Sequence, residues 1–199
     1  MIDWIAQVIG QFGYFGVAML MLLETLIPPI PSEVIMPLVG VAAARGELDI
    51  GLAIAAAVAG STAGATAWYA LARAYGRRRV IRLAERYGRW IGLSPALVDR
   101  ATGWFRTEGG WAIFLARILP GMRVYISVPA GLADMPVPRF LAFTLAGYLV
   151  WYGFLGLLGY GLGAWIDTRS FWLVMLLAVL VLWPLSKLLR RLRRQVDKS

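Results

Sequence analysis

Long apolar segments alternate with short polar ones along the chain, and this pattern predicts helices in a lipid bilayer. Residues 50–72 and 139–165 are each apolar over at least the roughly 20 residues that a helix needs to cross the hydrocarbon core. A further apolar segment at 171–186 runs directly into a basic tail at 187–199. All three are predicted to be transmembrane helices, with the tail anchored beside anionic headgroups.

The apolar segment at 14–44 differs from these, because prolines interrupt it. Pro28, Pro31 and Pro37 leave no uninterrupted run long enough for a helix that crosses the bilayer. A chain that enters the membrane, turns at the prolines and returns to the same side is the simplest solution. Irregular backbone at that depth is tolerated only where it is buried in protein or lines water. The segment is therefore predicted to be a re-entrant hairpin.

A second segment, 112–134, repeats this arrangement. Pro120 and Pro129 are separated by the same number of residues as Pro28 and Pro37. Each proline-interrupted segment is followed by one of the predicted transmembrane helices. The sequence thus predicts one unit, a re-entrant hairpin plus a transmembrane helix, that occurs twice.

Two other segments mix apolar and polar side chains at helical spacing. Residues 1–12 place apolar side chains on one face and are predicted to form an interfacial helix. Residues 73–111 carry many arginines among apolar residues and are predicted to form amphipathic helices on the inner membrane surface. The formal net charge of +9 would favour nucleic acid as the partner of a soluble protein, but topology and anionic lipid explain it better here.

The distribution of positive charge predicts the orientation of the chain. The basic segments 73–111 and 187–199 both belong in the cytoplasm under the positive-inside rule. The first hairpin then opens to the outside and the second to the inside, so that the two units have opposite orientations. Inverted repeats with broken helices that meet at the midplane are typical of secondary transporters. The predicted fold is a single all-α integral membrane domain over residues 1–199, an inverted repeat with an extra C-terminal transmembrane helix.

Composition supports a membrane protein and excludes several classes of enzyme. Charged residues make up only 16% of the chain, whereas a soluble domain has about a quarter. The chain has neither cysteine nor histidine, so it offers no disulfide, no thiolate metal site and no imidazole for Ser–His, HExxH or phosphohistidine chemistry. No metal, cofactor or enzymatic activity is therefore predicted. A phosphatase in particular would need a Ser, Thr or carboxylate nucleophile that no imidazole assists.

Charged residues of opposite sign lie in the two hairpins. Glu24 and Glu33 belong to the first, and Arg117 and Arg123 belong to the second. An unpaired charge at a helix centre costs roughly 2.5–3.5 kcal/mol on insertion scales, so facing hairpins are expected to bring the acids and arginines together or to line a wet cavity. A purely structural ion-pair clasp is the alternative, although apolar residues would hold two hairpins equally well.

Three quoted segments carry a resemblance to a known family. GYFGVAMLMLLETLIPPIPSEVIMPLVG, GSTAGATAWYALARAYG and FLARILPGMRVYISVPAGLADMPVPRF resemble the DedA family of bacterial inner-membrane proteins, which shares the VTT domain with eukaryotic lipid scramblases. The likeness covers residues 13–165. It implies a multi-pass protein of the bacterial inner membrane with two opposed re-entrant hairpins.

The resemblance also implies a function. Family members are linked to recycling of undecaprenyl phosphate or to phospholipid scrambling, and are associated with proton-motive force. The family's paired arginines fall on Arg117 and Arg123, which would bind the lipid phosphate, because Arg presents a planar fork of donors to phosphate oxygens. Its functional acids fall on Glu24 and Glu33, which would form ion pairs or couple transport to protons. The implied partner is a membrane lipid. Whether the protein also forms a homodimer is left open.

Two other functions stay open at this point. One is a proton-coupled carrier for a small solute or drug, and the other is a non-transporting scaffold that supports envelope assembly. Among the remaining acids, Glu47, Asp49 and Asp134 are predicted to be solvated loop residues, with a role in gating as the alternative.

Overall fold

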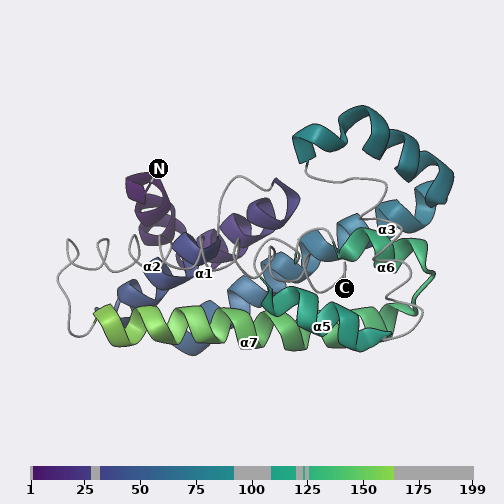
Figure 1. Cartoon of the computed structure of the whole chain (residues 1–199). Coiled ribbons are helices and arrows are strands. Elements are labelled where there is room, and N and C mark those ends of the chain that lie inside the picture. Colours follow the sequence, from purple (N-terminus) through teal and green to yellow (C-terminus); the bar gives the residue numbers. More distant parts are fainter. Residues whose placement is uncertain (1, 28–31, 92–108, 120–122, 124–125, 164–199) are drawn as a thin grey trace, which may run out of the picture.

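The computed structural model of the 199-residue chain describes residues 2–27, 32–91, 109–119, 123 and 126–163. The described residues are helical throughout, apart from short connections (Figure 1). Their elements are α1 (Ile2–Leu26), α2 (Ser32–Ala44), α3 (Ile50–Ile91), α5 (Gly110–Ile118), α6 (Ser127–Leu132) and α7 (Val137–Gly163).

Three of these helices contain stretches that are long and apolar enough to cross a membrane: Gln7–Leu26, Ile50–Gly76 and Val137–Gly163. This confirms the coarse prediction of an all-α membrane protein. The predicted transmembrane helix at 171–186 and the tail at 187–199 lie outside the described residues. Since Gln7–Leu26 also suits a span by length and composition, the re-entrant course of the first hairpin stays a prediction.

Glycines with positive φ interrupt the two longest helices. In α1 the backbone at Gly13 has φ 54° and ψ −132°, and in α3 the backbone at Gly76 has φ 72° and ψ 162°. Only glycine adopts such angles without a steric penalty. Gly76 falls where the apolar part of α3 ends and the basic part begins. Beyond it, α3 leaves the bundle (Figure 1, teal).

The two predicted hairpins exchange partners in their packing. The first arm of each packs on the span that follows it, α1 on α3 and α5 on α7. The second arm packs on the span of the other unit, α2 on α7 and α6 on α3. In Figure 1, α5 accordingly lies beside α7, and α6 lies beside α3. Neither unit is therefore a separate folding domain.

A glycine lies at each of these four helix contacts. A Cβ added there would collide with the neighbouring helix, in most cases with its backbone, so these contacts depend on the missing side chain. The glycine and its neighbour are Gly60 with Ala18, Gly147 with Arg117, Gly40 with Gly156, and Gly131 with Tyr69. This close approach explains why residues 60–76, GSTAGATAWYALARAYG, are rich in small side chains.

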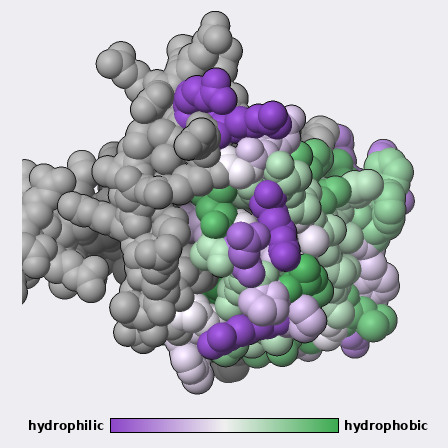
Figure 2. Space-filling model, turned by 90° about the vertical axis from the view of Figure 1, so that its right-hand side faces the viewer, coloured by the Kyte–Doolittle hydropathy of each residue, from purple (hydrophilic) through white to green (hydrophobic). Residues whose placement is uncertain are grey.

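Apolar side chains fill the centre and also cover the outside. Val17, Met36 and Phe140 are fully buried, whereas Phe15 and Phe154 are exposed. Such an outward apolar surface suits contact with lipid tails. The end of the molecule at the right of Figure 1 instead carries a patch of hydrophilic side chains bordered by apolar surface (Figure 2).

Candidate functional site: a buried charge cluster between the hairpins

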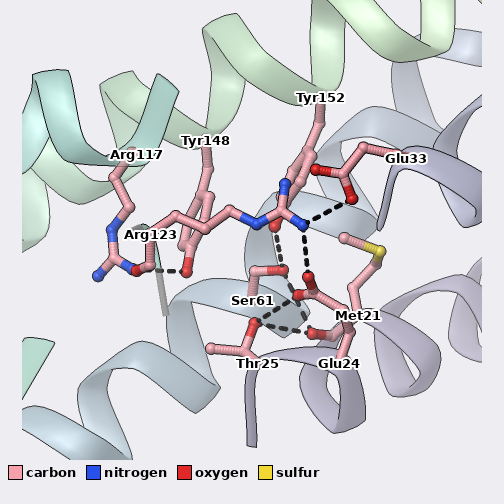
Figure 3. A network of polar contacts seen from close by, with 9 residues as sticks. All are labelled: Met21, Glu24, Thr25, Glu33, Ser61, Arg117, Arg123, Tyr148 and Tyr152. Carbon is pink, nitrogen blue, oxygen red and sulfur yellow. Dashed lines mark hydrogen bonds and ion pairs between the residues drawn. The ribbon is translucent and has the colours of Figure 1, made fainter. Parts of the chain in front are cut away.

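Three of the four predicted charged residues meet directly. The Nη2 atom of Arg123 donates to Glu24 Oε1 at 2.8 Å and to Glu33 Oε2 at 3.1 Å (Figure 3). Glu24 lies near the C-terminus of α1, Glu33 in the first turn of α2, and Arg123 between α5 and α6. The guanidinium therefore joins both arms of the first hairpin to the second.

The two carboxylates differ in burial and in support. The Glu24 side chain is 3% exposed, and Thr25 Oγ1 lies 3.2 Å from its second oxygen. The Glu33 side chain is 28% exposed and has the longer contact to Arg123. Glu24 is thus enclosed by protein, whereas the Glu33 side chain is partly accessible from outside the protein.

Arg117 takes a different direction from the one predicted for it. Its side chain is fully buried and donates to Ser127 Oγ at 2.7 Å, to Tyr148 Oη at 2.9 Å and to the carbonyl oxygen of Arg123. Its Cζ atom lies 4.6 Å from the centroid of the Tyr148 ring. No ion pair joins Arg117 to an acid within the described part of the chain, so it braces the backbone that presents Arg123.

A polar network that was not predicted surrounds these charges. Tyr152 Oη and Ser61 Oγ hydrogen-bond to each other at 2.9 Å, and Ser61 donates to the carbonyl oxygen of Met21 at 3.3 Å (Figure 3). Tyr148 stacks on Tyr152, one turn away on α7, with ring centroids 5.1 Å apart. The signal available in the sequence was a pair of tyrosines at i and i+4 in an apolar helix, since a buried hydroxyl needs a partner.

The cluster lies halfway along two spans. Ser61 is near the midpoint of the stretch Ile50–Gly76, and Tyr152 is near the midpoint of Val137–Gly163. Charges at that depth are expensive unless they pair or face water, and they commonly mark a transport path.

The predicted turn prolines separate into two groups. Pro28, Pro31 and Pro120 lie outside the described residues. Pro37 and Pro129 lie within helices, so their assignment to the hairpin turns is wrong. Pro129 is the third residue of α6, where a backbone N–H would lack a helical partner in any case. Pro37 is in the interior of α2, and its backbone packs against Gly159 of α7. This tertiary contact stabilises α2 despite the proline.

The other predicted acids lie outside the charge cluster, before or beside α3. Asp49 Oδ1 accepts from the Leu52 N–H at 2.9 Å as an N-cap, and the Asp49 N–H donates to Tyr14 Oη at 2.9 Å. Asp134 has φ 51° and pairs with Arg73 at 3.5 Å, where the Asp134 side chain is largely exposed and the Arg73 side chain is about half-buried. Glu47 is exposed in the turn before α3.

Apolar spans around a buried carboxylate–guanidinium cluster define a helical membrane protein with a charged centre. Comparison with known proteins narrows this class. A family model described as the VTT domain matches residues 30–161. The chain belongs to this family, the DedA family, which confirms the resemblance noted in the sequence.

Curated relatives carry two kinds of name. The chain is 41% identical over 160 residues to "Alkaline phosphatase-like protein" of Lactococcus lactis subsp. cremoris, covering 80% of this chain and 75% of the relative. It is 34% identical over 155 residues to "Undecaprenyl phosphate transporter A" of Staphylococcus aureus, covering 78% and 76%. The protein of that name in Bacillus subtilis is 30% identical over 161 residues, covering 80% and 77%. No solved structure gives a significant match.

Proposed function

We propose that the protein moves a lipid with a phosphate headgroup, undecaprenyl phosphate or a phospholipid, across the bacterial inner membrane. The observation that carries this proposal is Arg123, a guanidinium held at mid-span between two carboxylates of the opposite hairpin. The transporter name of two relatives supports the same substrate class.

The unequal burial of the two acids suggests how the site takes up a headgroup. Arg presents several donors in a plane, and these match phosphate oxygens. Glu33 is the more exposed partner, so an incoming phosphate replaces Glu33 on Arg123 while Glu24 stays in place. When the lipid leaves, Glu33 returns and the guanidinium is paired again. The lipid tail stays in the bilayer against the apolar outer surface, so no wide pore is needed.

Arg117 acts in this scheme through Arg123. Sequence reasoning placed both arginines on the phosphate, but the contacts of Arg117 within its own hairpin favour a positioning role. By donating to the Arg123 carbonyl and to Ser127, it holds the chain between α5 and α6 in the shape that aims Arg123 at the acids.

Charge balance favours coupling to protons. Two arginines and two glutamates leave the empty cluster formally neutral, and an added phosphate makes it negative. Uptake of a proton by the displaced Glu33, or by Glu24, offsets that charge in a medium where net charge is expensive. We therefore propose that the proton-motive force drives the loaded carrier.

The geometry of the two hairpins supports alternating access by an inverted repeat. The first arms of both begin after a glycine with nearly the same backbone angles, φ 54° and ψ −132° at Gly13 and φ 57° and ψ −125° at Gly109. A residue with a Cβ disfavours these angles, so two glycines with the same backbone conformation at matching positions support two copies of one unit. Each copy would open the central site to one side of the membrane, with the C-terminus in the cytoplasm.

Reconstituted vesicles test the proposal. Wild-type protein is expected to move labelled undecaprenyl phosphate or phospholipid between leaflets, faster with a pH gradient, and Arg123→Ala is expected to abolish the movement. Arg79→Ala, which removes an exposed arginine from the basic part of α3, is the matched control. Equal transport by wild type and Arg123→Ala would refute the site.

The same vesicles separate the other functions. A small-solute carrier would give a solute-dependent pH signal without any lipid substrate, and Glu24→Gln would remove that signal. A scaffold would keep full function when the acids and arginines are exchanged between the hairpins. Release of inorganic phosphate from the labelled lipid would indicate an enzyme, as the phosphatase-like name of one relative invites.

A further inference from the structure

Several buried polar atoms around the proposed site, Arg117 Nε among them, have no hydrogen-bond partner within the described residues, and two of these atoms are donors on neighbouring side chains. Within the part of the chain that the structure describes, neither Nη1 of Arg123 nor Nε1 of Trp151 makes a hydrogen bond, although both atoms are shielded from the surroundings. Buried donors are almost always paired, because an unpaired one forfeits the hydrogen bonds it made to water. These two atoms therefore call for an explanation.

The two donors belong to side chains in contact. The Cζ atom of Arg123 lies 5.9 Å from the centroid of the Trp151 ring. Trp151 precedes Tyr152 on α7 and is partly buried, with its ring tilted against Phe154 at 6.3 Å. Trp151 thus lies between Arg123 of the charge cluster and Phe154, which is exposed on the apolar outer surface.

The position of Trp151 argues against an ordinary interfacial tryptophan. Such residues lie at the membrane surface, where the indole N–H reaches headgroups or water. Trp151 instead lies near the middle of the stretch Val137–Gly163, where no water or headgroup is at hand unless the protein brings one. Trp68 shows what the fold supplies when a tryptophan is structural, because its Nε1 donates to the Thr25 carbonyl at 3.1 Å.

We infer that Trp151 is a headgroup-binding residue: its indole N–H and Arg123 Nη1 donate to two oxygens of one lipid phosphate. This inference rests on the proposed function and adds a second protein contact to it. A phosphate monoester offers three free oxygens and a phosphate diester offers two, so both can accept from two donors, and the shared chemistry is an anionic phosphate on a hydrocarbon tail. The indole is a neutral donor, which lets it bind the anion without adding charge at mid-span.

Binding in detergent measures this role apart from transport. The affinity of the full chain for a short-chain prenyl monophosphate, for short-chain phosphatidylglycerol and for the prenyl alcohol is determined by calorimetry. Trp151→Phe keeps the aromatic ring and removes the N–H, so it is expected to weaken binding of phosphate ligands about tenfold and to leave alcohol binding unchanged. The phosphate ligand that the wild-type chain binds more tightly identifies the monoester or the diester as the preferred headgroup.

Two controls protect this result against misfolding. Trp111→Phe removes an exposed indole from α5 and is expected to bind like wild type. If Trp151→Phe does not fold, the sulfur analogue of tryptophan placed at 151 preserves the shape and still removes the donor. Unchanged phosphate affinity in both Trp151 variants, or an equal loss for the alcohol, would overturn the inference.

Arg123→Ala, measured alongside, separates this inference from the proposed function. Loss of phosphate binding in Arg123→Ala with wild-type binding in Trp151→Phe would overturn only the role of Trp151. Trp151-dependent binding in a protein that moves no lipid would remove the proposed transport and keep Trp151 as an anion ligand.

Discussion

The two predicted hairpins share a framework and differ in how their charges are held. Both first arms begin after a glycine of the same unusual conformation, and both pack on the span that follows. The second hairpin braces itself, because Arg117 reaches Ser127 and the Arg123 carbonyl within the same segment. The carboxylates of the first predicted hairpin, in contrast, have their cationic partner, Arg123, in the other predicted hairpin. The comparison indicates that contacts within the second predicted hairpin fix the position of Arg123. The acids of the first predicted hairpin then pair with Arg123.

Removing Arg123 is expected to have the largest effect, because the acidic hairpin then loses its partner. Arg123→Ala should abolish lipid transport and lower stability by about 3–5 kcal/mol, since it leaves two carboxylates facing each other in a buried site. Combining it with Glu24→Gln and Glu33→Gln should recover the stability and leave transport absent. Thermal unfolding in detergent and vesicle transport measure the two effects. Recovery of transport in the triple variant would contradict the comparison.

Loosening the self-braced hairpin is expected to have the next largest effect. Arg117→Lys keeps the charge but cannot reach Ser127, Tyr148 and the Arg123 carbonyl together, so transport should fall about tenfold or more. Ser127→Ala removes one of these contacts and should cause a smaller loss. Initial transport rates over a range of lipid concentrations check this order. A wild-type rate in Arg117→Lys would show that the brace is dispensable.

The two acids should separate in their response to a pH gradient. Glu33→Gln is expected to retain passive lipid movement and to lose its stimulation by the gradient, because the displaced partner can no longer take up a proton. Glu24→Gln is expected to lower passive movement as well, since Glu24 is the enclosed partner of Arg123. Transport with and without a gradient distinguishes them. Identical behaviour of the two variants would contradict the assignment of unequal roles.

The smallest effect is expected at the edge of the cluster. Tyr152→Phe removes one hydrogen bond to Ser61 and keeps the stack on Tyr148, so transport should fall by about threefold to tenfold, as expected for loss of about 1 kcal/mol. Ser61→Ala should cause a somewhat larger loss, because it also removes the hydrogen bond to the Met21 carbonyl. The double variant should match Ser61→Ala, because both changes remove the bond between Ser61 and Tyr152. A fully additive loss in the double variant would place the two hydroxyls in separate roles.

Much of the architecture was accessible from the sequence, and the details of the site were not. Apolar length predicted the spans now found in α3 and α7, and the signs of Glu24 and Arg123 predicted attraction across the hairpins. The direction of Arg117 was missed, because a long side chain selects among partners that only tertiary packing brings within reach. Pro37 was missed for a related reason, since close packing against α7 outweighs the local preference of proline to end a helix.

The exchange of second arms between the two units has a consequence for biosynthesis. While the ribosome is still making the middle of the chain, α2 can contact α1 and α3, but α7, its main partner, has yet to be made. Until then Glu24 and Glu33 also lack Arg123, their partner from the later half of the chain. The exchanged packing of the second arms can therefore form only after α7 has been inserted.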